Sequence, residues 1–218
     1  MKILLTADIH GSELAVKMLK AIGKCFDFTI VCGDVSPKFI DEGKKRSEVQ
    51  KEWFENVFLP LMEDINGYFI LGNDDFIEYE GKRVLRGFQV INGLRIFAYD
   101  KVLHTPFNTN REVSDEDIWM DLRKVEKALN LDLFVTHAPP YGILDKVGSK
   151  HFGSQSIRGF AYWQKPKVHC FGHIHESFGV IEDENSGIVF INAAFEIKTR
   201  FVVAEFSSNK SEVDVYTI

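Results

Sequence analysis

Six short apolar runs recur along the chain, and each is followed, directly or after one glycine, by a side chain that can bind a metal. Their lengths and their β-branched and aromatic residues predict buried strands. The runs are Lys2–Ala7, Phe28–Cys32, Tyr68–Leu71, Leu133–Thr136, Val168–Phe171 and Gly187–Ile191. Ligands of open α/β sheets bind where the carboxyl ends of the strands meet, so we expect the polar side chains that follow these runs to lie together.

Helical periodicity fills the gaps between the strands. Serines at 12, 47, 114 and 154 stand at the start of four predicted helices, and serine is a favoured N-cap residue. The expected buried faces are Leu14, Met18, Ala21 and Cys25 in the first helix, Val49, Trp53, Val57 and Leu61 in the second, and Ile118, Leu122, Val125 and Leu129 in the third. The fourth should end at Trp163, before Pro166. This alternation predicts an α/β fold with helices on both sides of the sheets.

The end of the chain breaks the alternation. Residues 201–206 and 212–216, joined by residues 207–211, predict a C-terminal antiparallel hairpin. Two long loops, Ser36–Arg46 and Asp100–Val113, directly follow strands and should overhang the carboxyl edge, where such loops shape pockets. No linker rich in proline, glycine or serine divides the chain, so residues 1–218 are expected to form a single domain.

The composition narrows the class of protein. Of the 218 residues, 45% are hydrophobic and 27% are charged, as in globular proteins. A net charge of −6 makes nucleic acid an unlikely partner, because phosphate backbones select an excess of Lys and Arg. The three cysteines have no CxxC spacing, no apolar stretch has the length of a membrane span, and Met1-Lys2 leads straight into a predicted strand. We therefore expect a cytoplasmic protein with no membrane partner.

The side chains at the strand ends are carboxylates, an amide and imidazoles. They are Asp8, His10, Asp34, Asn73, His137, His173 and His175. This mixture suits Mn, Fe, Zn, Ni or Co rather than an all-oxygen calcium cage. A two-ion centre, with ions about 3.5–4 Å apart, needs a bridging carboxylate, and Asp34 after Gly33 is the natural candidate. Two such divalent transition-metal ions would lower the pKa of a bridging water and hold the hydroxide in line with a phosphorus.

Five motifs in this order resemble the calcineurin-like metallophosphoesterase superfamily. They are Asp8-x-His10, Gly33-Asp34, Gly72-Asn73-x-Asp75, His137 and Gly172-His173-x-His175, and residues 136–142 and 172–176 are similar to the compact prokaryotic branch related to class III cyclic-nucleotide phosphodiesterases. The resemblance implies a four-layered α/β/β/α sandwich with mixed sheets. It also implies that Asp8, His10, Asp34 and His175 hold one ion, and that Asp34, Asn73, His137 and His173 hold the other.

One position departs from this resemblance. The superfamily has a histidine where this chain has Asp74, and that histidine contacts phosphate and protonates the leaving oxygen. Asp74 and Asp75 are the candidate catalytic residues. Asp74 is either a protonated acid or an anionic bystander that repels phosphate, and in the second case substrates with good leaving groups are favoured.

Four further residues are candidates for substrate binding. Asn73 would contact phosphate as well as metal, and His104 would replace the missing proton donor unless it is a plain surface histidine. His151 lies in the loop after His137, where substrate is expected, and Arg158 would bind phosphate or form a surface salt bridge.

The sequence thus predicts a dinuclear metal-dependent phosphoesterase that hydrolyses phosphodiesters or activated phosphate esters, with a small phosphate ester or nucleotide as substrate. The alternatives are a phosphomonoesterase or nucleotide pyrophosphohydrolase, and a metal- and nucleotide-binding regulator with little turnover. Exposure of two of the aromatic residues Phe160, Tyr162 and Trp163 would indicate a homo-oligomer contact.

Overall fold

A five-stranded sheet carries the first three predicted strands. The computed structural model describes residues 1–38, 40, 42–126, 129–207 and 212–218. The strand order is β15-β14-β1-β2-β3. The bounds are Lys2–Thr6 for β1, Phe28–Cys32 for β2, Gly67–Ile70 for β3, Val202–Phe206 for β14 and Val213–Thr217 for β15. β1, β2 and β3 are parallel, whereas β14 pairs antiparallel with both β1 and β15. The turn between β14 and β15 was predicted at residues 207–211, of which 208–211 lie outside the described residues.

A six-stranded sheet carries the remaining predicted strands, in the order β12-β13-β11-β8-β5-β4. Its strands are β4 (Gly87–Ile91), β5 (Leu94–Tyr99), β8 (Leu133–Thr136), β11 (Val168–Phe171), β12 (Gly179–Asp183) and β13 (Ile188–Asn192). The inner strands β13, β11, β8 and β5 are parallel, and the edge strands β12 and β4 are antiparallel. Two short strand pairs, β6 (Val102–Leu103) with β7 (Glu112–Val113) and β9 (Lys146–Val147) with β10 (Lys150–His151), stand apart.

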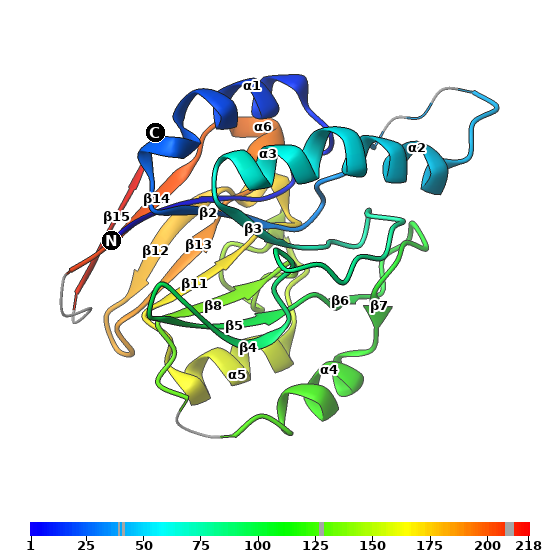
Figure 1. The fold of residues 1–218 in the computed structure, drawn as a ribbon. Helices are drawn as coiled ribbons and strands as arrows, with labels where there is room; N and C mark the ends of the chain where they lie inside the picture. The colour runs from blue at the N-terminus through cyan, green and yellow to red at the C-terminus, as the bar shows by residue number, and fades with distance from the viewer. Residues whose placement is uncertain (39, 41, 127–128, 208–211) are drawn as a thin grey trace.

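The two sheets lie face to face, with helices outside each (Figure 1). Helices α1 (Glu13–Ile22), α3 (Leu59–Asp64) and α6 (Phe195–Lys198) lie over the first sheet, with α2 (Arg46–Trp53) beyond its edge, and α4 (Asp115–Leu122) and α5 (Gln155–Gln164) lie over the second. Short 3₁₀ turns occupy Gly23–Cys25 and His175–Ser177. Alternate residues of a strand face opposite sides, so Ile3 and Leu5 pack between the sheets while Leu4 packs under the helices. The predicted mixed α/β fold is confirmed.

Three of the serine caps are confirmed. The hydroxyl of Ser12 accepts a hydrogen bond from the amide of Ala15, that of Ser114 from Asp117, and that of Ser154 from Ile157. Ser114 and Asp117 form a complete capping box. The second helix begins at Arg46 instead of Ser47, with Lys45 as its N-cap.

The predicted faces of the first two helices need correction, and the third helix ends earlier than predicted. α1 buries Ala15, Val16 and Leu19, and Leu14 is 50% exposed. Apolar residues surround most of this helix, so their spacing does not select the face that docks. In the second helical region, a π-helical turn at Phe54–Phe58 joins α2 to α3. The buried residues Gln50, Phe54, Phe58 and Met62 lie one position beyond the predicted stripe, although Leu61 is buried as expected. In α4, Ile118 and Leu122 are buried as predicted. The helix ends at Leu122, so Val125 and Leu129 lie beyond it, although both pack against the same core.

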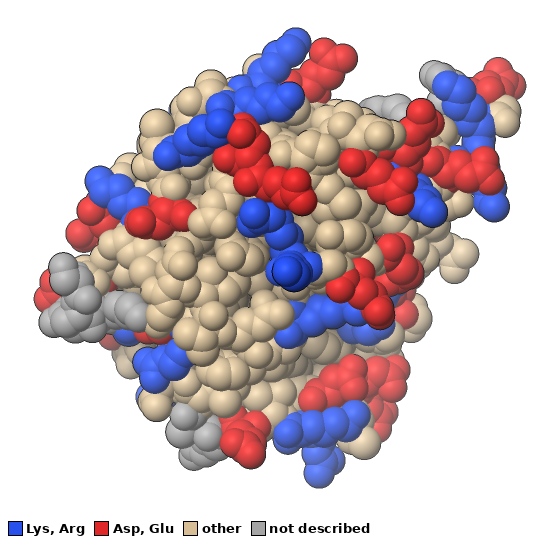
Figure 2. Space-filling view, viewed as in Figure 1, with Lys and Arg blue, Asp and Glu red and all other residues tan. Residues whose placement is uncertain are grey.

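The surface carries both signs of charge. On the face seen in Figure 1, Lys and Arg are interspersed with Asp and Glu (Figure 2). Of the three aromatic residues on α5, Phe160 is buried, Tyr162 is half-buried and only Trp163 is exposed, at 38%. The condition for an oligomer contact there is therefore not met. Within the described ranges, no helix has both the length and the apolar character needed to cross a membrane.

Candidate metal centre

The seven predicted ligands follow five strands drawn from the two sheets. Asp8 and His10 follow β1, Asp34 follows β2 and Asn73 follows β3, whereas His137 follows β8 and His173 and His175 follow β11. Because the strands are parallel within each sheet, these residues lie at one edge. The first three strands supply mostly oxygen donors, and the last two supply imidazoles.

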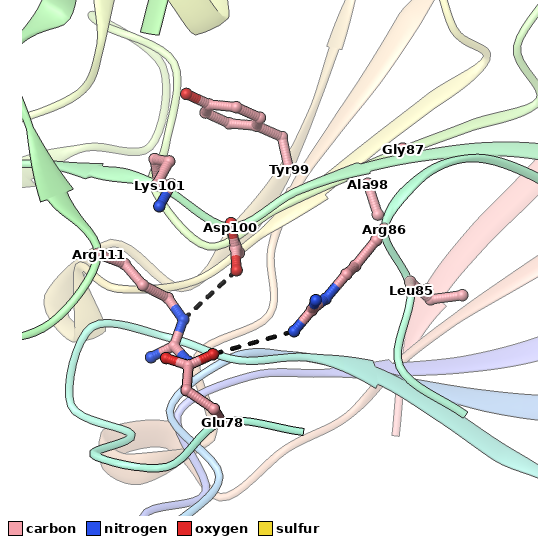
Figure 3. Close-up of a pocket in the computed structure, with 9 residues that line it drawn as sticks. All are labelled: Glu78, Leu85, Arg86, Gly87, Ala98, Tyr99, Asp100, Lys101 and Arg111. Carbon is pink, nitrogen blue, oxygen red and sulfur yellow. Dashed lines mark hydrogen bonds and ion pairs between the residues drawn. The ribbon is translucent and has the colours of Figure 1, made fainter. Parts of the chain in front are cut away.

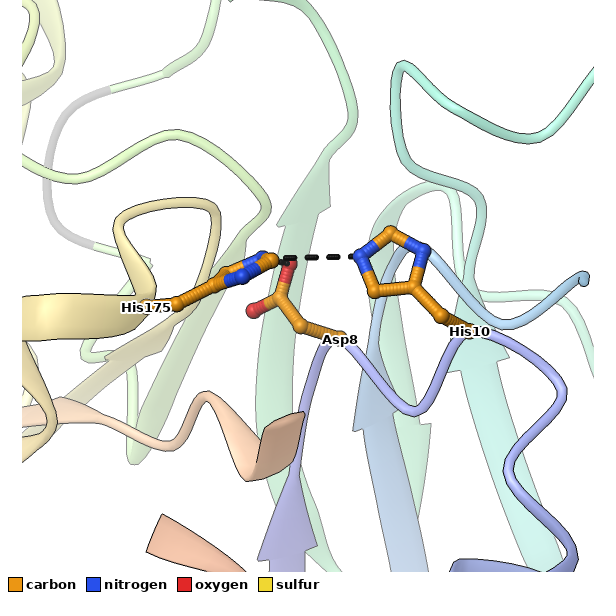
Figure 4. Close-up of side chains that lie close together, drawn as sticks. All are labelled: Asp8, His10 and His175. Carbon is orange, nitrogen blue, oxygen red and sulfur yellow. Dashed lines mark hydrogen bonds and ion pairs between the residues drawn. The ribbon is translucent and has the colours of Figure 1, made fainter. Parts of the chain in front are cut away.

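Asp8, His10 and His175 form the first cluster (Figure 4). The Nε2 atom of His175 lies 3.2 Å from Asp8 Oδ1 and 3.4 Å from His10 Nε2. Asp8 Oδ1 is buried, and apart from this ion-pair contact with His175 it has no hydrogen-bond partner among the described residues. A buried carboxylate oxygen without a hydrogen bond is costly unless another group binds it. This donor set fits a divalent transition ion.

Asp34, His137 and His173 form the second cluster. Asp34 Oδ2 lies 3.4 Å from His137 Nε2 and 3.8 Å from His10 Nε2, so this carboxylate stands between the two clusters. Asn73 Oδ1 lies 3.0 Å from His137 Nε2. The Asn73 amide nitrogen donates to Thr109 Oγ1, which fixes the amide with its oxygen toward the histidine. The second donor set therefore also fits a transition ion, with Asp34 common to both.

The backbone at the ligands adopts an unusual conformation. Asp8, His10, Asp34 and His173 have φ between 42° and 70°. Left-handed backbone costs roughly 1–3 kcal/mol for a residue with a side chain, and it is concentrated at functional sites. Four of the seven candidate ligands carry it. The chain turns sharply at each of these strand ends, and the turn directs the side chain into the centre.

Glycines allow the strand ends to approach one another. A Cβ on Gly72 would overlap the Asp34 carboxylate, and one on Gly172 would overlap the carboxylate of Asp8. Each of these glycines belongs to a motif with its neighbouring ligand. Without a side chain, Gly72 lets Asp34 approach from the neighbouring strand end of the same sheet, and Gly172 lets Asp8 approach from the other sheet.

Burial and neighbouring charges shift the pKa values of the clustered carboxylates and imidazoles in different directions. Burial opposes ionisation of Asp34, but the neighbouring histidines, His137 above all, hold its pKa well below the ordinary value. Burial also opposes the charge on His137, yet Asp34 raises the pKa of that imidazole to about 10. For His173, burial and the charge of His137 lower the pKa to about 4. A cationic imidazole thus balances the buried carboxylates in the metal-free protein.

Asp75 and Asp74 have different surroundings. The Asp75 carboxylate is fully buried and accepts hydrogen bonds from the amides of Val35, Ser36 and Gly72. Burial and the charge of Asp34 raise its pKa. These contacts tie the loop after β2 to the loop after β3, so Asp75 is placed to hold the centre together. Asp74, by contrast, lines the pocket above the centre.

That pocket has a volume of about 300 Å³, and its walls come from both predicted loops. Lys38 and Arg46 come from the first loop, and Phe107 and Thr109 come from the second. The prediction that both loops shape the metal cleft is confirmed for the described residues, although residues 39 and 41 lie outside them. Phe107 is 80% exposed.

Three predicted substrate residues lie elsewhere. His104 is exposed, with Nδ1 3.8 Å from Glu112. Nδ1 of His151 lies 2.5 Å from Oδ1 of the buried Asp145, and Arg158 donates to the Tyr141 carbonyl. None of the three is among the residues that line the pocket. Their roles in substrate binding stay predictions.

Two residues at the centre lie outside the five sequence motifs. Glu196, on α6, places Oε2 2.6 Å from His175 Nδ1 and 3.6 Å from Lys38 Nζ. Arg46 places Nη2 2.5 Å from Asp74 Oδ2. Nothing in the sequence paired Glu196 with His175, or Arg46 with Asp74.

Arg111 joins the second loop to the strand end that carries Asn73. Its guanidinium, 5% exposed, donates to the carbonyls of Gly72, Asp75 and Ile77. Arg111 also lines a separate surface pocket of about 310 Å³, where it faces Asp100 and Glu78, and Arg86 approaches Glu78 from the other side (Figure 3). The charges that line this second pocket are thus paired with one another.

Comparison with known proteins gives a family match over most of the chain. The family model described as calcineurin-like phosphoesterase matches residues 1–177. An uncharacterized protein of Methanocaldococcus jannaschii is 31% identical over 195 residues, covering 81% of each chain. A UPF0046 protein of Caenorhabditis elegans is 30% identical over 145 residues, and the match spans 63% of this chain but only 45% of that protein. A crystal structure of a Thermus thermophilus protein shares the fold, with a TM-score of 0.63 at 12% identity over 99% of this chain and 97% of the other.

Proposed function

The chain belongs to the calcineurin-like phosphoesterase family, and we propose that it hydrolyses phosphodiesters or activated phosphate esters with two divalent transition ions at its strand ends. One observation carries the proposal. The Asp34 carboxylate lies between two clusters, 3.8 Å from His10 of the first and 3.4 Å from His137 of the second. A carboxylate between two sets of imidazole and carboxylate donors is what a bridged pair of ions requires.

The residues divide into two ligand sets. Asp8, His10, Asp34 and His175 would hold one ion, and Asp34, Asn73, His137 and His173 the other. Bound there, two divalent ions would supply the positive charge that makes a water nucleophilic near neutral pH and stabilises phosphoryl oxygens.

The pocket supports a small anionic substrate. A volume of about 300 Å³ suits a small phosphate ester or a nucleotide, and Lys38 and Arg46 add positive charge beside the ligands. Asn73 would contact phosphate as well as metal. We further propose that the enzyme works in the cytoplasm.

The test combines metal analysis with turnover. Metal-saturated wild-type protein should contain two ions per chain and should hydrolyse bis-p-nitrophenyl phosphate with added Mn. Asp34→Ala should remove both ions together, whereas Asn73→Ala should mainly affect one. Asp64→Ala is the matched control, because this exposed carboxylate pairs with Lys24 at 2.6 Å on the surface. At most one ion in the saturated wild-type protein would contradict the proposal.

A second candidate rests on Asp74, which stands where the family has its proton donor. A regulator that binds metal and nucleotide with little turnover would keep both ions and bind phosphate. It would hydrolyse neither esters with poor leaving groups nor esters with good ones. Turnover with a good leaving group separates this candidate from the enzyme. Comparing the rates of hydrolysis of p-nitrophenyl phosphate, a nucleoside triphosphate and the diester would distinguish a phosphomonoesterase or a nucleotide pyrophosphohydrolase from a phosphodiesterase.

A further inference from the structure

The carboxylate of Asp74 is held against a guanidinium. Asp74 is 9% exposed, and its Oδ2 lies 2.5 Å from Arg46 Nη2 and 3.8 Å from His10 Nδ1. Both Asp74 and Arg46 line the pocket above the metal centre. The negative charge that would repel a phosphate is therefore paired with a positive charge from another segment.

Arg46 is fixed from several sides. It is the first residue of α2, and its guanidinium carbon lies 4.6 Å from the centroid of the Phe76 ring, a cation–π contact. Gln50, one turn along α2, donates to the carbonyl of Asp74 and accepts from the amide of Phe76. The helix start and the loop carrying Asp74 thus form one unit, so the position of Arg46 relative to Asp74 is set by the fold.

The guanidinium keeps a donor that Asp74 does not use. Nη2 of Arg46 lies 2.5 Å from Asp74 Oδ2, whereas the buried Nε has no hydrogen-bond partner among the described residues. A guanidinium presents a planar fork of donors that matches phosphate oxygens. Buried N–H groups beside an anion pocket are ready to bind an oxygen there.

We propose that Arg46 binds a non-reacting oxygen of the substrate phosphoryl group, and that Asp74 is a positioning residue that acts through Arg46. The inference rests on the proposed function and refines it. Charge stabilisation by Arg46 replaces the imidazole donor, so no proton is delivered to the leaving oxygen from this side. The substrates served best are phosphodiesters and activated esters whose leaving groups depart as stable anions.

The test is a double-mutant cycle on the metal-loaded protein, with bis-p-nitrophenyl phosphate as substrate and inorganic phosphate as inhibitor. Arg46→Gln should lower kcat/KM by roughly 10²- to 10³-fold, the usual effect of losing one donor to a developing anion. The inhibition constant of phosphate should rise at least tenfold, with metal content unchanged. Arg46→Lys keeps the charge but loses the fork, and should give an intermediate loss. Lys45→Gln removes an exposed charge one position away, which pairs with Glu48, and should leave both constants unchanged.

Asp74→Asn tests the positioning role. In the wild-type background it should lower kcat/KM and weaken phosphate inhibition, because the guanidinium is no longer held. In the Arg46→Gln background it should cause no further loss, since residues that act as a unit are not additive. A further loss of about 10²- to 10⁴-fold there would show that Asp74 donates a proton itself, and would overturn the proposal.

Binding separates this inference from the proposed function. Calorimetric titration of metal-loaded protein with inorganic phosphate requires no turnover. Absence of esterase activity in the wild type, with phosphate binding that still weakens in Arg46→Gln, would reject the enzyme and keep Arg46 as the anion ligand. Unchanged phosphate binding in both Arg46→Gln and Arg46→Lys would reject the role of Arg46 whatever the turnover. Thermal unfolding of each variant identifies any loss of folded protein.

Discussion

Glu196 offers the sharpest test of how the centre is supported. Its Oε2 lies 2.6 Å from His175 Nδ1 and 3.8 Å from His10 Nε2. The other ring nitrogen of His175 faces Asp8 at 3.2 Å. A carboxylate that accepts the second N–H of a metal-binding histidine fixes its tautomer and orientation and raises its basicity. Glu196→Gln keeps the shape of the side chain and removes the charge.

The expected loss of metal affinity in Glu196→Gln follows from this geometry. Removing such a carboxylate typically weakens metal binding by roughly 10- to 100-fold, or about 1.4–2.7 kcal/mol. The loss should be confined to the ion at Asp8, His10 and His175, because the described contacts of Glu196 are to His10, His175 and Lys38. The second ion, at His137 and His173, should bind as in the wild type.

Two-step titration of metal-free protein with Co²⁺, followed by visible absorption and calorimetry, measures both affinities. Glu205→Gln is the matched control, because Glu205 has a similarly exposed side chain, 38% against 35%, and pairs with Lys2 at 3.0 Å. The control should leave both affinities unchanged. Equal weakening of both ions by Glu196→Gln, or no weakening of either, would refute the role assigned to Glu196.

Three further predictions concern the frame and the mouth of the site. Gly172→Ala places a methyl group against the Asp8 carboxylate, so it should cost about 1–3 kcal/mol by overpacking and weaken the first ion in metal titrations; normal affinity would show that this space is not needed. Arg111→Lys loses hydrogen bonds to the carbonyls beside Asn73. The calorimetric Tm should therefore fall by roughly 3–12 °C, and binding of the second ion should weaken. Arg86→Lys, in the pocket that Arg111 also lines, is the control and should change neither quantity. Phe107→Ala should leave Tm nearly unchanged but raise KM for aryl esters by about 2- to 13-fold, as expected for loss of an aromatic contact of about 0.5–1.5 kcal/mol; an unchanged KM would remove Phe107 from the binding site.

Much of the centre could be predicted because its signal is local. A polar residue directly after a buried apolar strand is visible in the sequence, and the parallel arrangement brings such residues to one edge. The caps at Ser12, Ser114 and Ser154 are equally local, because each serine bonds an amide three residues away. These features depend on neighbours along the chain and need no knowledge of packing.

The remaining features depend on contacts between distant segments. Arg46 and Asp74 are 28 positions apart, and they meet where Gln50 and Phe76 join the start of α2 to the loop after β3. Glu196 reaches His175 from a four-residue helix whose place is set by the end of β13. The prediction of which face of α1 packs against the core was wrong for a similar reason. The surrounding core buries Leu19 and leaves Leu14 exposed.

The division of ligands between two sheets has a consequence for how the protein folds. Asp8, His10, Asp34 and Asn73 come from one sheet and His137, His173 and His175 from the other, and the chain completes the first sheet with β14 only after building the second. Neither candidate ligand set is whole in one sheet, so two ions would reach their full ligand sets only after the sheets have docked. Their binding energy would then stabilise the docked state over partly folded ones, and metal uptake during refolding should report the moment at which the two sheets come together.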